Sequence, residues 1–236
     1  MFIREQTLIF AQDNKANVKG ELTMKKILSI LAFMLMASMT NAQIAPSCPD
    51  ENHPHAIDLG LPSGTKWACC NIGASHPEES GDFYAWGETT NKNDFSWATY
   101  IHCDGSYDTC HDLGANIAGM SYDVAHEKWG DKWQMPSSEQ INELIKNCTS
   151  KWKTLNSLKG RYYTGPNGNT IFLPAAGYRW GGNLYRINGN GYYWSSSQGP
   201  SQSDYAYLLN VSSKSSLLDE YYRYYGHMIR SVWCEE

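Results

Sequence analysis

The residues with the clearest chemistry lie near the end of the chain, where tyrosine, asparagine, serine and glycine are interleaved. Ten of the 16 tyrosines fall between residues 178 and 225. Tyr and Trp offer a large amphipathic contact area with few rotatable bonds, while Asn, Ser and Gly add adaptable hydrogen bonds. This composition predicts a ligand-binding surface. The predicted contacts are Tyr185, Asn188, Asn190, Tyr192, Tyr221, Tyr222, Arg223 and Tyr224.

The alternative interpretation of these aromatic residues is a β-sheet core, because aromatic residues are enriched in strands generally. Successive side chains of a strand point to opposite faces. In YYRYYG (221–226) both faces are aromatic, so one of them must meet solvent, a partner or another layer. We therefore expect one aromatic face in the core and the other at the surface.

The cysteines favour disulfide chemistry. The seven are Cys48, Cys69, Cys70, Cys103, Cys110, Cys148 and Cys234. An odd number leaves at least one thiol free or paired between chains. Cys103 and Cys110 are candidates to close a short loop, and Cys148 is a candidate partner for Cys70 or Cys69. A zinc site is disfavoured because the chain has no CxxC pair.

Metal binding and catalysis have weaker signals. Asp104, Asp108 and Asp112 offer carboxylate oxygens, but calcium takes six or more ligands and the spacing of four differs from that of an EF-hand loop. We expect no cofactor, and calcium at these residues is the open alternative. A cysteine nucleophile needs an activated thiolate beside a base, and the histidines are scattered. No catalytic residue is expected.

Two arginines, Arg179 and Arg230, lie within apolar strand patterns. A buried charge requires partners. The carboxylates of Asp82, Glu88 and Glu139 are the candidate partners.

The N-terminal region predicts export. From Met24 the chain carries two lysines, an apolar run over 27–39 and a small-residue cleavage site before Gln43, which together are typical of a signal peptide over 24–42. A transmembrane helix would need about 20 apolar residues. We expect 1–23 to be a mis-assigned extension, 43–54 a linker and 55–236 the domain.

Charge and compartment limit the partners. The chain has 19 Lys and Arg against 24 Asp and Glu, a net charge of −5, which argues against nucleic acid or an anionic membrane surface. No transmembrane span is expected in the mature chain. The expected location is the exterior, the outer cell surface or the periplasm, where disulfides persist.

The elements that would position these residues are two helices and a run of strands. Ser137 and Gln140 form a capping box for a helix over 137–148, and a weaker helix is expected over 123–129. A short strand is expected before the Pro-Ser-Gly turn at 62–64, a second strand at 65–69, a strand or loop at 81–88, a loop at 89–120, and only strands after Thr170. This order predicts an α+β fold in which one or two helices pack on short, mainly antiparallel strands. The expected core is Ile141, Leu144, Ile145, Ile171, Phe172, Leu173, Trp194, Leu209 and Val232.

Several blocks resemble a known family in order along the chain. KWACCNIGASHPEESGDFYAWGET, WGDKWQMPSSEQINELIKNC, IFLPAAGYR and GYYWSSS…RYYGHMIRSV resemble the Fibrobacter succinogenes major paralogous domain (FISUMP) family over about residues 55–233. The resemblance implies a C-type-lectin-like fold, similar to formylglycine-generating-enzyme-type domains and to the variable proteins of retroelements. It brings no catalytic or ligand residues. The adjacent cysteines at 69–70 and the extra Cys234 depart from the family pattern.

These observations predict a secreted or cell-surface ligand-binding or adhesion module without catalytic activity, whose ligand is an extracellular glycan or protein. Two alternatives remain. One is a structural surface protein that self-associates, and the other is an enzyme with a Cys or carboxylate site in the same cleft, related to the formylglycine-generating-type folds.

Overall fold

The computed structural model describes residues 55–130 and 132–234. The predicted extension (1–23), signal peptide (24–42) and linker (43–54) lie outside the described residues. Within them, no helix has the length and apolar character needed to cross a membrane.

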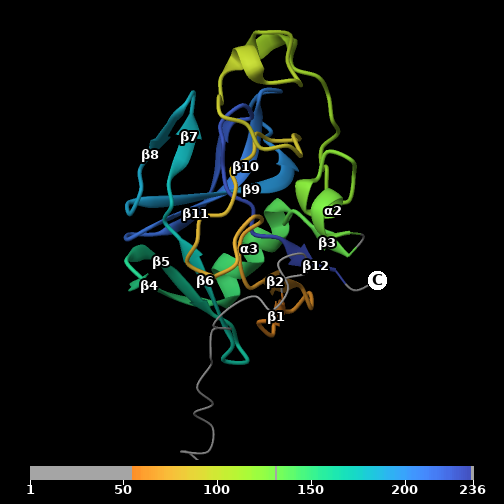
Figure 1. Cartoon of the computed structure of the whole chain (residues 1–236). Helices are drawn as coiled ribbons and strands as arrows, with labels where there is room; N and C mark the ends of the chain where they lie inside the picture. The colour runs from red at the N-terminus through yellow and green to blue at the C-terminus, as the bar shows by residue number, and fades with distance from the viewer. Residues whose placement is uncertain (1–54, 131, 235–236) are drawn as a thin grey trace, which may run out of the picture. The chain divides into compact units, whose positions relative to one another are not determined.

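The strands of the described residues form four sheets, and every pair in them is antiparallel (Figure 1). One sheet has the order β1 (Ala56–Asp58), β2 (Lys66–Ala68), β12 (Val232–Trp233) and β3 (Trp133–Gln134). The second has the order β11 (Ser216–Tyr222), β10 (Tyr205–Ser212) and β9 (Asn190–Gln198). The third contains β4 (Thr149–Leu155), β5 (Leu158–Thr164) and β6 (Thr170–Pro174), and the fourth is the hairpin of β7 (Tyr178–Trp180) and β8 (Asn183–Tyr185).

Both predicted helices are present. Helix α3 (Ser138–Asn147) begins after the N-cap Ser137, whose hydroxyl accepts from the Gln140 N–H while the Gln140 side chain accepts from the Ser137 N–H. Helix α2 (Val124–Trp129) begins after Asp123, whose carboxylate caps the first turn. Two short 3₁₀ helices, η1 (Trp97–Thr99) and η2 (Tyr107–Thr109), lie within the predicted loop. The fold is therefore α+β, with mainly antiparallel strands, as predicted.

The β9–β10–β11 sheet separates two layers of core. Alternate residues of β10 point to opposite sides, so Leu209 and Val211 join one buried cluster with α3, β5, β6 and β12, whereas Ala206 and Leu208 join another with α2 and β3. In β9 the same alternation separates Tyr193 from Trp194. Both faces of this sheet are thus covered, which explains why its strands are apolar on both sides.

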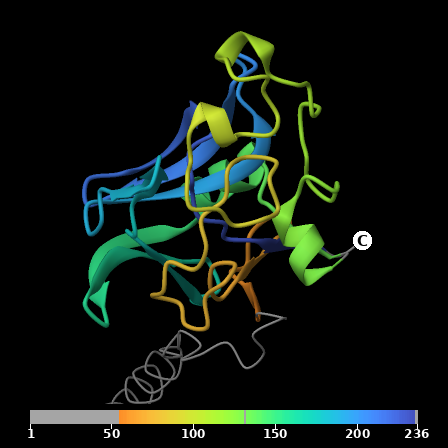
Figure 2. The ribbon, with the colours of Figure 1, turned by 45° about the horizontal axis from the view of Figure 1, so that its top comes forward.

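The two larger layers meet through specific contacts. Figures 1 and 2 show the β4–β5–β6 sheet and the β9–β10–β11 sheet as separate layers, with the β7–β8 hairpin beside the second. The Arg161 guanidinium of β5 donates to the Ser212 carbonyl at 2.5 Å, and the Tyr163 hydroxyl bonds that of Ser216 at 2.6 Å. These bonds fix the orientation of the sheet whose far end carries the tyrosine-rich turn.

The predicted core is confirmed with one difference. All of its members are buried except Ile145, which is partly buried against the first cluster. The stripe of α3 is centred on Ile141 and Leu144, so Ile145 lies at its margin.

Candidate functional site

The predicted contact residues lie in four different environments, beginning with the two asparagines that follow β8. Asn188 is exposed in the turn after β8, Asn190 is the partly buried first residue of β9, and both side chains already make structural hydrogen bonds. The Asn188 side chain accepts from the Lys159 N–H at 2.8 Å, and the Asn190 amide donates to the Asn210 side chain at 3.0 Å. Their amides therefore tie the turn to β5 and β10.

Three other predicted contacts are buried, so the prediction that they touch a ligand is corrected. Tyr192 and Tyr224 have exposed fractions of 5 % and 7 %, and Arg223 is fully buried. The Arg223 guanidinium stacks 4.4 Å from the centre of the Trp86 ring and donates to the Tyr100 hydroxyl and to the Ser203 carbonyl. Strand β11 ends at Tyr222, and the chain then turns inward, which buries the two residues that follow.

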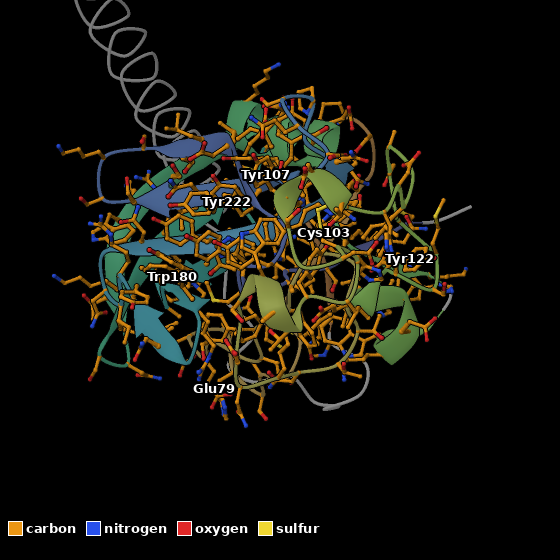
Figure 3. All side chains as sticks on the ribbon, turned by 90° about the horizontal axis from the view of Figure 1, so that it is seen from above. Glu79, Cys103, Tyr107, Tyr122, Trp180 and Tyr222 are labelled. Carbon is orange, nitrogen blue, oxygen red and sulfur yellow. A yellow bond between two sulfur atoms is a disulfide. The ribbon has the colours of Figure 1, made fainter. Side chains whose placement is uncertain are left out.

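Two more of the predicted residues, Tyr185 and Tyr222, belong to a continuous surface of rings, which we call the aromatic strip. Its members are partly or largely exposed: Trp97, Trp180, Tyr185, Tyr205, Tyr222 and Tyr225. Trp180 is the most exposed, at 48 %. Figure 3 looks down on the molecule and places Trp180 and Tyr222 in one half of the view, with Tyr122 in the other.

Ring contacts join the strip from end to end. Trp180 lies 5.9 Å from Tyr185 and 6.2 Å from Tyr225, measured between ring centroids. Tyr225 continues to Tyr222 at 6.0 Å, and Tyr222 to Tyr205 at 4.6 Å. All four pairs are tilted, and because each ring packs against its neighbours, the strip presents ring faces held by these contacts rather than independent side chains.

A second layer of rings supports the strip from below. Tyr221, which was predicted as a contact, is partly buried here, and its ring lies 5.3 Å from that of Tyr225. The fully buried His227 lies beneath both, with ring centroids 5.5 Å and 6.1 Å away. Neither ring nitrogen of His227 has a hydrogen-bond partner among the described residues. Burial holds the pKa of His227 well below its usual value, so the ring is neutral.

The phenols of Tyr192, Tyr221 and Tyr225 stay protonated at neutral pH. Burial raises the pKa of Tyr192 to about 12, and burial also raises the pKa values of Tyr221 and Tyr225. These hydroxyls can therefore donate and accept hydrogen bonds but do not act as bases. The chemistry available is stacking and hydrogen bonding, which suits recognition.

The β7–β8 hairpin, which carries Trp180 and Tyr185, was not expected as a separate element. Gly177, at φ +79°, precedes it, and a Cβ there would lie 1.9 Å from the Tyr185 carbonyl oxygen. Only glycine permits this approach. The signal for the hairpin was the RWGGN stretch at 179–183, where two glycines lie between aromatic and polar residues.

The cysteines are only partly as predicted. Cys103 and Cys110 form a disulfide. The proposed bridge from Cys148 to Cys70 is not formed, since Cys148 carries a free thiol and packs at the end of α3 against the first core cluster. Cys70 instead packs with Cys69 and Ala74. Burial, with a contribution from Glu143, raises the pKa of the Cys148 thiol to about 11.

The three aspartates proposed as calcium ligands instead contact side chains or backbone groups of their own loop. Asp104 pairs with His111 at 3.2 Å, Asp108 accepts from the Ser106 hydroxyl, and Asp112 accepts from the Gly114 N–H at 2.8 Å. In the part of the chain that the structure describes, no group of three His, Cys, Asp or Glu side chains is arranged to hold a metal ion.

The arginine partners also differ from expectation. Arg230 is fully buried and donates only to neutral acceptors, the Asn71 side chain and backbone carbonyls that include that of Phe172. Arg179 lies over the Phe83 ring at 5.4 Å. Of the expected carboxylate partners, Glu88 pairs with Lys92. The others are engaged by neutral groups: Asp82 accepts from Tyr84 and Asn91, and Glu139 from Ser138.

Comparison of the chain with protein-family models, with curated proteins and with solved structures finds no match.

Proposed function

We propose that the domain is an exported ligand-binding or adhesion module that contacts an extracellular glycan or protein through the aromatic strip. The observation that carries the proposal is the continuous set of partly exposed rings, held by ring contacts and led by Trp180 at 48 % exposed. Large apolar side chains gathered on one surface are typical of binding sites. Tyr and Trp also bury much area for few rotatable bonds.

Export and the absence of catalysis are parts of the same proposal. Export is supported by the signal-peptide pattern at 24–42 and by the Cys103–Cys110 disulfide, since disulfides persist in oxidising compartments. A role without catalysis is supported by the chemistry of the candidate groups. Burial raises the pKa of the Cys148 thiol and the pKa values of the Tyr205 and Tyr225 phenols.

We also propose that the chain belongs to the FISUMP family and has a C-type-lectin-like fold. The supporting observations are the sequence blocks that resemble the family and their placement. The blocks contribute β2, β3, α3, β6 and the strands around the aromatic strip. Superposition of experimental structures of this chain and of FISUMP members tests the assignment, and a different strand order would refute it.

The binding proposal is tested with oxidised protein covering 43–236 on glycan arrays and on host and bacterial surface extracts. A variant with Trp180→Ser and Tyr222→Ser removes two partly exposed rings without opening the core. We expect it to bind at least roughly tenfold more weakly, since central aromatic residues dominate binding energies. The matched control changes Met120 and Tyr122 to Ser, because both are exposed large side chains outside the strip.

Two results would redirect the proposal. Binding that the strip variant and the control weaken equally removes the strip as the site. If no glycan or extract binds and the protein instead self-associates, with the association lost in the strip variant, the strip is a contact between copies. Analytical ultracentrifugation over a range of concentrations measures that association.

A further inference from the structure

A pocket of about 470 Å³ lies between the loop 73–82 and the β7–β8 hairpin. Carboxylates and apolar side chains line it on different sides: Glu78, Glu79, Asp82, Leu158, Leu184 and Ile187. Ile187 and Leu184 are 52 % and 37 % exposed, so the apolar side is open to solvent. The pocket therefore combines an acidic part with an apolar wall.

The acidic part is built by close backbone packing. Gly73 and Gly81 both have positive φ, and a Cβ on Gly73 would lie 2.7 Å from the Asp82 carboxylate. A Cβ on Gly81 would lie 2.2 Å from the Ile72 carbonyl oxygen. Two glycines thus let the loop fold tightly enough to hold the Asp82 carboxylate at the pocket.

Hydrogen bonds hold the three carboxylates in place, and Glu79 Oε1 also lies 3.3 Å from the imidazole Nδ1 of His76. Asp82 accepts from the Tyr84 hydroxyl at 3.0 Å and from Asn91 at 2.9 Å, and Glu78 accepts from the Asn156 amide at 2.5 Å. Glu79 accepts from backbone N–H groups of the same loop. Among the described residues no Lys or Arg forms an ion pair with any of the three.

The apolar wall comes from the face of the hairpin opposite to the aromatic strip. Leu184 alternates with Tyr185 along β8, so the two side chains point to different faces. Arg179 pairs with Leu184 across the hairpin and shares its face, where its guanidinium lies over Phe83. The pocket therefore stands as a separate site, whether or not the strip binds a ligand.

We propose that this pocket binds a lysine side chain of a protein partner. The ammonium group meets the carboxylates of Glu78, Glu79 and Asp82, and the methylene stem lies along Leu184 and Ile187. Long basic side chains bury their stems on apolar surface while the charged head stays near polar groups. Carboxylates that form no ion pair with a described Lys or Arg supply the electrostatic complementarity that selects such a partner.

The test is an NMR titration of ¹⁵N-labelled, oxidised protein (43–236) with a capped peptide that carries one lysine between two leucines. Two matched peptides carry norleucine or glutamate in place of the lysine, and pentylammonium alone tests for a free amine. We expect the lysine peptide to shift the amides of Gly73, Gly81 and Ile187. The norleucine and glutamate peptides should leave these amides unshifted at the same concentration.

Charge-neutral variants of the pocket test whether the carboxylate charges contribute to binding of the lysine peptide. Asp82→Asn together with Glu78→Gln removes two charges while one acceptor oxygen stays at each position, and should weaken the binding of the lysine peptide by about tenfold, at roughly threefold for each partly exposed charge. Asp108→Asn with Asp112→Asn is the control, because it removes two charges from the disulfide-closed region outside the pocket. Arg179→Met should strengthen binding, since it removes the cation on the same face.

Equal binding of the lysine and norleucine peptides would overturn the charge assignment and leave an apolar groove. Binding of pentylammonium as tight as that of the peptide would replace the protein partner with a free amine. No shift at these amides at millimolar peptide would remove the site. None of these outcomes depends on Trp180 or Tyr222, so failure here is distinguishable from failure of the aromatic strip.

Discussion

Replacement of Arg230 by methionine should destabilise the domain by about 3 kcal/mol, because the guanidinium makes several buried hydrogen bonds. Nε donates to Asn71 Oδ1 at 2.8 Å, Nη1 to the Cys69 and Ala68 carbonyls at 3.0 and 3.2 Å, and Nη2 to the Phe172 carbonyl at 3.0 Å. These bonds tie the loop after β2 to β6, and so fix one side of the acidic pocket.

The magnitude follows from two opposing effects. Removal of the guanidinium leaves five buried acceptors without this donor, the fifth being the Pro77 carbonyl at 3.5 Å, at about 1 kcal/mol for each. Methionine also relieves the desolvation of a buried charge, which returns roughly 2 kcal/mol, because no carboxylate compensates that charge. Burial lowers the pKa of Arg230, which agrees with a charge held at a cost. The net loss of about 3 kcal/mol corresponds to roughly 6 to 12 °C in Tm for a domain of this size.

The assay is urea unfolding of oxidised protein (43–236), followed by tryptophan fluorescence, because buried tryptophans lie in both core layers. Arg179→Met is the matched control. Its guanidinium is partly exposed over Phe83, so we expect a loss of at most about 1 kcal/mol. A loss below about 1 kcal/mol for Arg230→Met would refute the reasoning, since it would mean that the desolvation cost of the charge equals the worth of its hydrogen bonds.

Two further predictions concern the aromatic layer and the disulfide. The folded state depresses the pKa of His227, so the unfolded chain binds more protons below pH 6.5, and stability should fall by about 2 kcal/mol between pH 6.5 and pH 5. His227→Phe should remove that part of the pH dependence in urea unfolding, and identical profiles for the two proteins would contradict the assignment. The Cys103–Cys110 bridge spans a sequence separation of 7, so changing both residues to serine should lower the unfolding free energy by about 2 kcal/mol. Unchanged stability in the doubly substituted protein would show that the loop is held by its other contacts.

The elements that sequence patterns predicted well are those with local determinants. Helix α3 has its cap at Ser137 and its apolar stripe within one segment, so nothing distant decides it. The β4–β5 hairpin at 149–164 was not expected. Its burial pattern is largely exposed on β4, where Lys151 and Lys153 alternate with partly buried residues, so the strand lacks an apolar run. Strand β5 of this hairpin pairs with β6, and Gly160 lies opposite Pro174 in that pairing. The hairpin therefore depends on a contact with another strand, which local sequence patterns do not show.

The exposure of individual tyrosines in the candidate site could not be predicted from local sequence. Composition pointed to the aromatic region as a whole but could not sort its members: Tyr192 and Tyr224 are buried, whereas Tyr205 and Tyr225 are partly exposed. The difference arises where β11 ends and the chain turns inward at Arg223, whose partners come from residues about 20 and 120 positions away. Local alternation could not reveal such partners.

The short β7–β8 hairpin contributes to both candidate binding surfaces, the aromatic strip and the acidic pocket. Its strands have three residues each, and a two-stranded hairpin is marginal on its own. Here its backbone is bonded to three other segments: Arg179 exchanges two hydrogen bonds with Gly226, Gly181 exchanges two with Phe95, and the Gly177 N–H donates to the Asn190 carbonyl. Because the hairpin is fixed before any ligand arrives, Trp180 on one face and Leu184 on the other can contact a partner without the entropic cost of ordering a loop.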